Sequence, residues 1–140
     1  MDVLIDSNII VDVIQEREPF CSYSKSIIAM CIKDEITGYV SAHSLCDLFY
    51  ILRKDKTISE RLALIANLCK YMNVISEKQD DFEVLSENPA TKDLEDGLQM
   101  LCAKNYNLDY IISRNIKDFE SSYVPAIDPC DFLKLIKQEN

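Results

Sequence analysis

The chain has 140 residues, of which 48% are hydrophobic and 28% charged, and its formal net charge is −9. These values are typical of a globular protein, and we expect one domain over residues 1–140 with a substantial core. No hydrophobic run approaches the ~18 residues that a membrane-spanning helix requires. With 24 acidic and 15 basic residues, the chain does not bind nucleic acid through bulk positive charge, although its charge suits a basic partner.

The amino-terminal segment has none of the features of a secretion signal. It contains Asp2 and Asp6 within its hydrophobic run and lacks a basic leader, which favours a cytoplasmic protein. Six cysteines occur without a C-x-x-C pair, and His43 is the only histidine, so the sequence does not favour a zinc site. Several cysteines lie in hydrophobic stretches, as buried thiols do in a reducing compartment. For His43 we expect a solvated or packed side chain rather than a catalytic one.

Hydrophobic patterning predicts strands and helices that alternate along the chain. Strands are expected at residues 3–6, 39–41, 73–76, 109–113 and 123–127. Helices are expected at residues 7–16 (capped by Ser7 or Asn8), 21–33, 44–53, 59–72, 78–86 and 93–107, and from 128 onward. This alternation predicts a three-layer α/β/α fold: a central, mostly parallel sheet of about five short strands with helices on both faces. Pro125 favours a sheet edge for the last strand.

The same patterning predicts which side chains are buried. At helical spacing, the inward residues are expected to be Leu62, Ile65, Ala66 and Leu68/Cys69 in one helix and Leu94, Leu98 and Leu101 in another. Tyr39, Tyr50, Tyr110 and Phe119 are expected in the core. Solvated positions are expected for Asp12, Asp34, Glu35, Asp80, Asp81 and Glu83.

Polar and acidic residues follow two of the predicted strands and begin a helix. Asp6 ends the first strand, and the residues after the fourth are Ser113, Arg114, Asn115 and Asp118. The helix before the fourth strand opens with Asp93, Glu95 and Asp96, where its dipole favours negative charge. Dipole electrostatics alone could explain those three acids. In open parallel sheets, however, sites form at the carboxyl ends of strands, which would bring Asp6 and the residues after 112 together.

Three segments resemble the PIN-domain ribonucleases, especially the branch that includes VapC-like toxins of bacterial toxin–antitoxin pairs. They are LIDSNIIVDVI, GYVSAHSLCDLFYILRK and KDLEDGLQMLCAKNYNLDYIISRNIKDF, and the resemblance continues into VPAIDPCDFL. Each segment alone is a weak signal, but three in this order and spacing are specific. The resemblance implies a PIN-like fold over nearly the whole chain.

The resemblance also implies that Asp6, Asp47 and Asp96 converge in one acidic pocket. Clustered carboxylates repel one another and raise each other's pKa unless a cation is present. Oxygen ligands suit Mg²⁺ or Mn²⁺ rather than zinc or copper. Such a metal activates a water and neutralises charge on a phosphate, so the implied reaction is metal-dependent hydrolysis of RNA phosphodiesters by an endoribonuclease.

Two positions depart from the pattern of the wider family. Asp47 stands where glutamate is common, although aspartate is usual in the VapC-like branch. A fourth acid commonly follows a Ser/Thr-Arg pair, whereas Asn115 follows Ser113-Arg114 here. Asn115 keeps a carbonyl ligand, and Asp118 is the nearest acid, so either is a candidate for the fourth catalytic position.

Several residues are candidates for supporting roles. Asn8 is expected to hold the turn beside Asp6, and Ser113 to orient a carboxylate or to be only a strand-end hydroxyl. For Asp93 we favour a helix cap over a role beside the metal. Candidate RNA contacts are Arg53, Lys54, Lys56, Arg114 and Lys117, which are otherwise ordinary solvated charges.

The implied partners are RNA and a small antitoxin protein, and a homodimer is one option for assembly. Two alternatives remain beside the ribonuclease. A catalytically silent PIN-like binding module is consistent with Asn115. A receiver-type phosphoacceptor domain is not favoured, because the sequence lacks its adjacent acids and downstream lysine.

Overall fold

A five-stranded sheet forms the centre of the computed structural model, which describes residues 1–140. Every neighbouring pair of strands is parallel, in the order β3-β2-β1-β4-β5. The strands are β1 (Asp2–Ile5), β2 (Thr37–Ser41), β3 (Asn73–Ile75), β4 (Tyr110–Ile112) and β5 (Ala126–Ile127). The predicted α/β fold is confirmed, and the strand after Pro125 does lie at a sheet edge.

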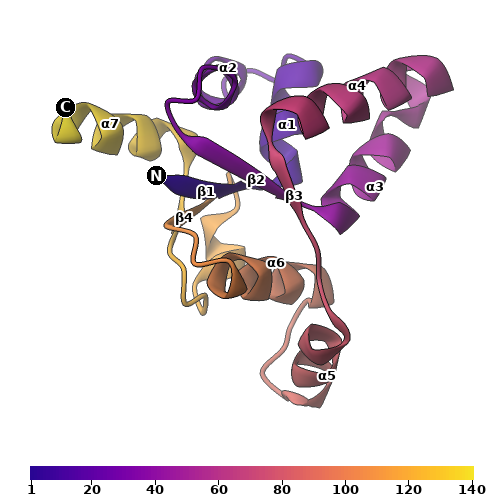
Figure 1. The fold of residues 1–140 in the computed structure, drawn as a ribbon, viewed down its shortest axis with the longest axis vertical. Helices are drawn as coiled ribbons and strands as arrows, with labels where there is room; N and C mark the ends of the chain where they lie inside the picture. Colours follow the sequence, from indigo (N-terminus) through magenta and orange to yellow (C-terminus); the bar gives the residue numbers. More distant parts are fainter.

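Helices cover both faces of this sheet (Figure 1). They are α1 (Ser7–Ile14), α2 (Cys21–Ile32), α3 (Ala42–Ile51), α4 (Ile58–Tyr71), α5 (Gln79–Glu87), α6 (Leu94–Asn105) and α7 (Pro129–Glu139), with short 3-10 helices η1 (Leu52–Lys54) and η2 (Ile116–Phe119). Helices α1, α2 and α4 lie on one side of the sheet and α5 and α6 on the other. None of the helices combines the length and hydrophobicity needed to cross a lipid bilayer.

Alternating side chains of the central strand supply both halves of the core. Val3 and Ile5 contribute to a cluster with residues of α1, α2, α3, α4 and α7. Leu4, between them, contributes to a second cluster with residues of α6 and η2. Because successive side chains of a strand point to opposite faces, Val3, Leu4 and Ile5 must all be hydrophobic, and β1 ends just before Asp6.

The buried faces of α4 and α6 differ from the predicted ones. Leu62 is 57% exposed, whereas Arg61 and Leu68 face inward. The Arg61 guanidinium donates to the Phe49 carbonyl at 2.7 Å and stacks on the Phe49 ring, so a hydrogen-bonded arginine occupies the expected place of a leucine. In α6 the inward residues include Leu98, Gln99 and Cys102, while Leu94 is exposed in the first turn.

Three further burial predictions are wrong. Tyr50 is 62% exposed, because it lies on the outer face of α3. Asp81 is buried, where it accepts hydrogen bonds from the Lys78 backbone N–H and from Asn105. Asp12 is also buried, because it pairs with Arg114 as described below. A buried carboxylate must be paired or hydrogen-bonded, and here the partners come from distant segments that the local pattern does not include.

All six cysteines are free thiols; three are buried, two are exposed, and Cys130 is intermediate. Burial raises the pKa of Cys31 and of Cys102 to about 12, so these thiols are unreactive members of the core. Cys46 and Cys69 are exposed on α3 and α4. The prediction that several cysteines are buried is therefore confirmed for Cys21, Cys31 and Cys102.

Candidate active site

The site is built around Asp6, where the chain passes from β1 into α1. Asp6 occupies the N-cap position of α1 with extended backbone, the place expected for Ser7 or Asn8. Its backbone N–H donates to the Ile112 carbonyl at 3.0 Å, which continues the pairing of β1 with β4. The side chain is therefore fixed at the carboxyl edge of the central strand, between β2 and β4.

The Asp6 carboxylate is held by side chains from three other segments. The Ser113 hydroxyl donates to Oδ2 at 2.7 Å, and the Asn8 amide donates to the same oxygen at 3.3 Å. The Gln99 amide, from α6, donates to Oδ1 at 3.4 Å. Burial raises the pKa of Asp6, with a further contribution from the charge of Asp118, and the Ser113 hydrogen bond opposes this rise.

The turn after β4 is tied to the first turn of α1. The Asn8 amide also donates to the Ser113 hydroxyl at 3.3 Å, and its carbonyl accepts from the Arg114 backbone N–H at 3.5 Å. The Asn115 backbone N–H donates to the Ser113 hydroxyl at 3.0 Å. Asn8 and Ser113 thus contact the Asp6 carboxylate, as their expected supporting roles require. Asn115 contacts Ser113 through its backbone N–H.

The start of α6 brings three more acids to the same edge. The Asp93 carboxylate accepts from the Asp96 backbone N–H at 2.8 Å, which confirms that Asp93 is a helix cap. The pKa of Asp96 is raised to about 6 by burial and by the charges of Asp93, Asp118 and Asp6. The charge of Asp118 in η2 contributes to the raised pKa of both Asp6 and Asp96, and the choice between Asp118 and Asn115 for the fourth position stays a prediction.

Asp47 interacts with Glu95, a residue in the first turn of α6, next to Asp96. The pKa of Glu95 is raised to about 7 by burial and then by its hydrogen bond with Asp47 and the charge of Asp47, while His43 lowers it. The ligand atoms of His43, Asp47 and Glu95 lie within 4.8 Å of one another, as do those of Asp128, Cys130 and Asp131. Asp6, Asp47 and Asp96 do not form such a group, so their joint metal site stays a prediction.

Four residues of this region were not predicted to have a role in the site. They are His43, Glu77, Glu95 and Gln99. The His43 ring bonds to Glu77 through Nδ1 and places Nε2 3.8 Å from a Glu95 oxygen. A spacing of four residues puts His43 and Asp47 on one helix face, a signal that could have drawn attention to His43.

The basic residues expected to contact RNA occupy different surroundings. Arg114 donates from Nε to Asp12 at 2.6 Å and stacks on the Phe20 ring, so its first role is an internal ion pair. Arg53 and Lys54 lie in η1, beyond the carboxyl end of α3, ~10 Å along the helix axis from Asp47. Lys117 is exposed in η2. Of the five basic residues expected to contact RNA, it alone is adjacent in sequence to an acid of the cluster, Asp118.

The donor chemistry of the cluster fits a hard divalent cation. Asp6, Asp96 and Asp118 offer only carboxylate oxygens, and burial, followed by the charges of neighbouring acids, raises the pKa of Asp6 and Asp96. Gln99, 1% exposed, has a buried Oε1 without a hydrogen-bond partner, beside an amide that donates to Asp6. Clustered oxygens with raised pKa values are expected of a site that is completed by Mg²⁺ or Mn²⁺.

A sequence model described as a PIN domain matches residues 2–117. The chain belongs to the PIN domain family. Ribonuclease VapC1 of Aquifex aeolicus (strain VF5) is 28% identical over 135 residues, which are 93% of this chain and 92% of that protein. The expected resemblance to the VapC-like branch of PIN-domain proteins is thereby confirmed.

Solved structures share this fold. A toxin–antitoxin complex from Klebsiella pneumoniae matches with a TM-score of 0.67 and 19% identity, over 91% of this chain and 97% of that one. VapBC2 from Rickettsia felis, bound to a promoter DNA fragment, matches with a TM-score of 0.67 and 18% identity, over 91% and 98%. The predicted PIN-like fold is therefore confirmed.

Proposed function

We propose that this PIN domain is a Mg²⁺- or Mn²⁺-dependent endoribonuclease and the toxin of a bacterial toxin–antitoxin pair. The observation that carries the proposal is the convergence of Asp6, Asp96 and Asp118 at the carboxyl edge of the sheet, with the pKa of Asp6 and Asp96 raised by burial and mutual charge. The similarity to Ribonuclease VapC1 supports the choice of RNA as substrate.

In this proposal each residue has a separate task. Asp6, Asp96 and Asp118 would hold the cation. Asp47, which interacts with Glu95, would add negative charge beside them. A divalent cation bound there would lower the pKa of a water and neutralise charge on the scissile phosphate. Ser113 and Asn8 keep the Asp6 carboxylate in one orientation through bonds of 2.7 and 3.3 Å.

The basic residues would contribute unequally to RNA binding. Lys117, exposed beside Asp118, would attract the phosphate backbone near the acids. Arg114 would chiefly hold the turn after β4 in place, because its Nε is engaged by Asp12. Arg53 and Lys54 lie beyond the end of α3, so they would contact RNA only if the bound RNA extended well away from the acids.

The test is an RNA cleavage assay on the purified chain. We expect end-labelled RNA to be cut internally in Mg²⁺ or Mn²⁺, and cleavage to stop in chelator and in Asp6→Asn or Asp96→Asn. The matched control is Asp80→Asn, which removes an exposed acid of α5 and should retain activity. If no cation supports cleavage by the intact chain, the catalytically silent binding module becomes the better account.

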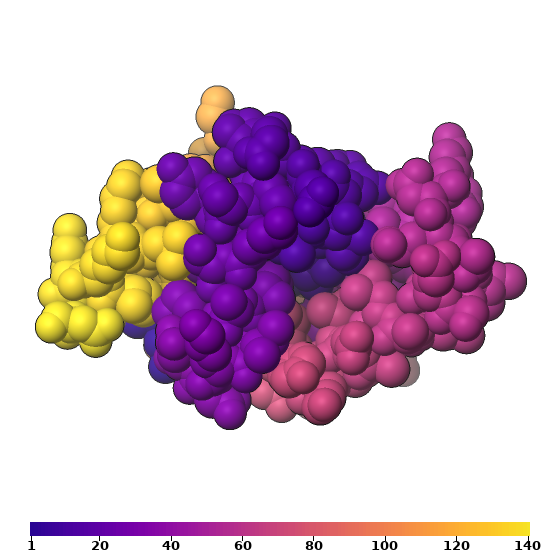
Figure 2. Space-filling model, turned by 90° about the horizontal axis from the view of Figure 1, so that it is seen from above, coloured from indigo at the N-terminus to yellow at the C-terminus, as the bar shows by residue number.

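An antitoxin would have two features to engage. Hydrophobic side chains are exposed on α3 and α4, at Tyr50, Ile51, Ile58 and Leu62. A depression of about 340 Å³ lies nearby, lined by Ile14, Gln15, Leu52, Asp55 and Lys56. In Figure 2 this region stands at one end of the molecule, opposite α7. We propose that a hydrophobic helix of the antitoxin packs here while a basic residue enters the acidic cluster.

A further inference from the structure

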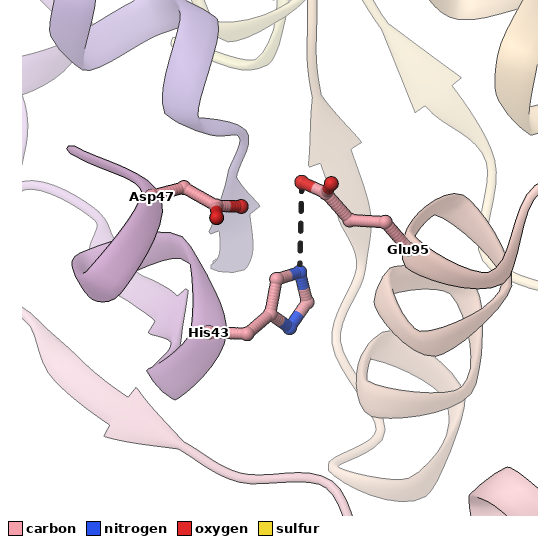
Figure 3. A group of neighbouring side chains, drawn as sticks. All are labelled: His43, Asp47 and Glu95. Atoms are coloured by element: carbon pink, nitrogen blue, oxygen red, sulfur yellow. Dashed lines mark ion pairs between the residues drawn. The ribbon is translucent and has the colours of Figure 1, made fainter. Parts of the chain in front are cut away.

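His43, the chain's only histidine, presents a ring nitrogen to two carboxylates. It lies in the first turn of α3, directly after β2. Figure 3 shows His43 and Asp47 projecting from α3 toward Glu95 of α6. Nε2 is buried, has no hydrogen-bond partner, and lies 3.8 Å from a Glu95 oxygen, which is too far for a hydrogen bond.

The opposite side of the ring is fixed by Glu77. Nδ1 is hydrogen-bonded to the Glu77 carboxylate, whose side chain is only 10% exposed. An ionised carboxylate can only accept, so Nδ1 carries a proton, and a neutral ring then has its lone pair at Nε2. A carboxylate behind a histidine is the arrangement that orients imidazole for metal binding and makes it a stronger ligand.

The groups that face Nε2 need a positive charge between them. Asp47 is four residues after His43 on the same helix face, and Glu95 comes from the first turn of α6. The ligand atoms of His43, Asp47 and Glu95 lie within 4.8 Å of one another, and two carboxylates held this close repel each other. A lone pair that faces two carboxylates adds to this repulsion, and a cation would relieve it.

We propose that His43 Nε2, Asp47 and Glu95 form a binding site for a transition-metal dication such as Mn²⁺, Fe²⁺, Co²⁺ or Zn²⁺. The site differs from the oxygen-only set around Asp6, and Asp47 borders both. One imidazole and two carboxylates are ligands that these ions accept, whereas Mg²⁺ and Ca²⁺ prefer oxygen alone. The proposal does not depend on RNA cleavage, because a metal can be detected on the imidazole itself.

A single labelled histidine makes the test specific. The full chain is prepared with ¹⁵N-histidine, and the two ring nitrogens are followed by NMR during titration with Zn²⁺ or Mg²⁺. We expect one equivalent of Zn²⁺ to shift Nε2 while Nδ1 stays protonated, and Mg²⁺ to leave both signals unchanged. If Zn²⁺ leaves Nε2 unchanged and the ring titrates as an imidazolium between Glu77 and Glu95, the proposal is overturned.

Variants then assign the ligands by calorimetric Zn²⁺ titration. A Cys130→Ser background is used, because Asp128, Cys130 and Asp131 also bring their ligand atoms together. Glu95→Gln should weaken Zn²⁺ binding more than ~10-fold, and Glu77→Ala by about 10- to 100-fold through loss of the orienting bond. Glu83→Gln, an exposed acid of α5, should change nothing. Equal Zn²⁺ affinity in all four proteins would rule out this ligand set.

Discussion

Ser113, immediately after β4, donates its hydroxyl proton to Asp6, at the end of β1, over 2.7 Å. The two residues are 107 positions apart in sequence and meet because β1 and β4 are paired neighbours. Ser113 is fully buried, so this bond is shielded from solvent. This bond holds Oδ2 of Asp6, while the Gln99 amide donates to the other carboxylate oxygen, Oδ1.

We predict that Ser113→Ala weakens Mg²⁺ or Mn²⁺ binding without unfolding the protein. Loss of the hydroxyl leaves Asp6 Oδ2 with the Asn8 amide as its remaining side-chain donor and costs about 1–3 kcal/mol in stability. Because the Ser113 bond lowers the pKa of Asp6, the variant should need a higher pH for metal binding. Calorimetric titration across pH measures this shift, and an unchanged pH profile would contradict it.

Arg114→Ala is expected to destabilise the fold as well as any RNA contact. Removal of the guanidinium leaves the fully buried Asp12 carboxylate with only the Ser24 hydroxyl, at 3.4 Å. Breaking a buried ion pair in this way typically costs about 3–5 kcal/mol, and the partly exposed arginine places the cost at the lower end. Urea unfolding measures it, with Lys117→Ala as the control that should leave stability unchanged. Equal stability of the two variants would mean that the ion pair is unimportant.

The sheet and the placement of Asp6 could be predicted because they follow from local hydrophobic runs and from the geometry of parallel strands. The buried faces of α4 and α6 could not be predicted, since a change of one residue rotates a helix by about 100°. Arg61 replaces Leu62 inside because its partner, the Phe49 carbonyl, belongs to α3. That partner is visible only once the two helices are packed.

Long-range polar pairs account for the main omissions at the site. His43 is isolated in the sequence, yet Glu77, 34 positions away, fixes its ring. Asp12 looks like an ordinary surface acid until Arg114, 102 positions away, is placed against it. Asp6, Asp47 and Asp96 could be assigned through the family resemblance, and Asn8 and Ser113 from their places beside Asp6. Gln99 and Glu77 could not be assigned, because they lie in segments far from their partners in the sequence.

The metal-free protein should lose stability as pH rises. The pKa values of Glu95 and Asp96, about 7 and about 6 in the fold, exceed their ordinary values of 4.5 and 3.8. The native state then holds protons that the unfolded chain releases, so this contribution is complete below about pH 4 and is lost as pH rises through about 6 to 7. In chelator, Tm should fall between about pH 5 and about pH 8. The Glu95→Gln/Asp96→Asn double variant should show a shallower fall, and parallel curves would contradict the assignment.

Asp96→Asn should melt no lower than the wild type in chelator. The substitution relieves repulsion from Asp93, Asp118 and Asp6, and the Asp96 backbone N–H keeps its bond to Asp93. Asp93→Ala is the contrasting variant, because it removes that cap and should cost about 1 kcal/mol. If thermal melts show a larger loss for Asp96→Asn than for Asp93→Ala, Asp96 has a structural role instead.

Binding of the antitoxin should depend on one hydrophobic and one electrostatic feature that respond differently to salt. Leu62→Asp places a charge on the exposed face of α4 and should weaken co-purification with the product of the neighbouring gene at every salt concentration. Asp6→Asn removes a charge that a basic residue would meet, so its effect should shrink as salt screens the attraction. The control Val84→Asp changes an exposed residue of α5, remote from the proposed helix site, and should bind normally. A Leu62→Asp protein that binds like the wild type would place the antitoxin on a different surface.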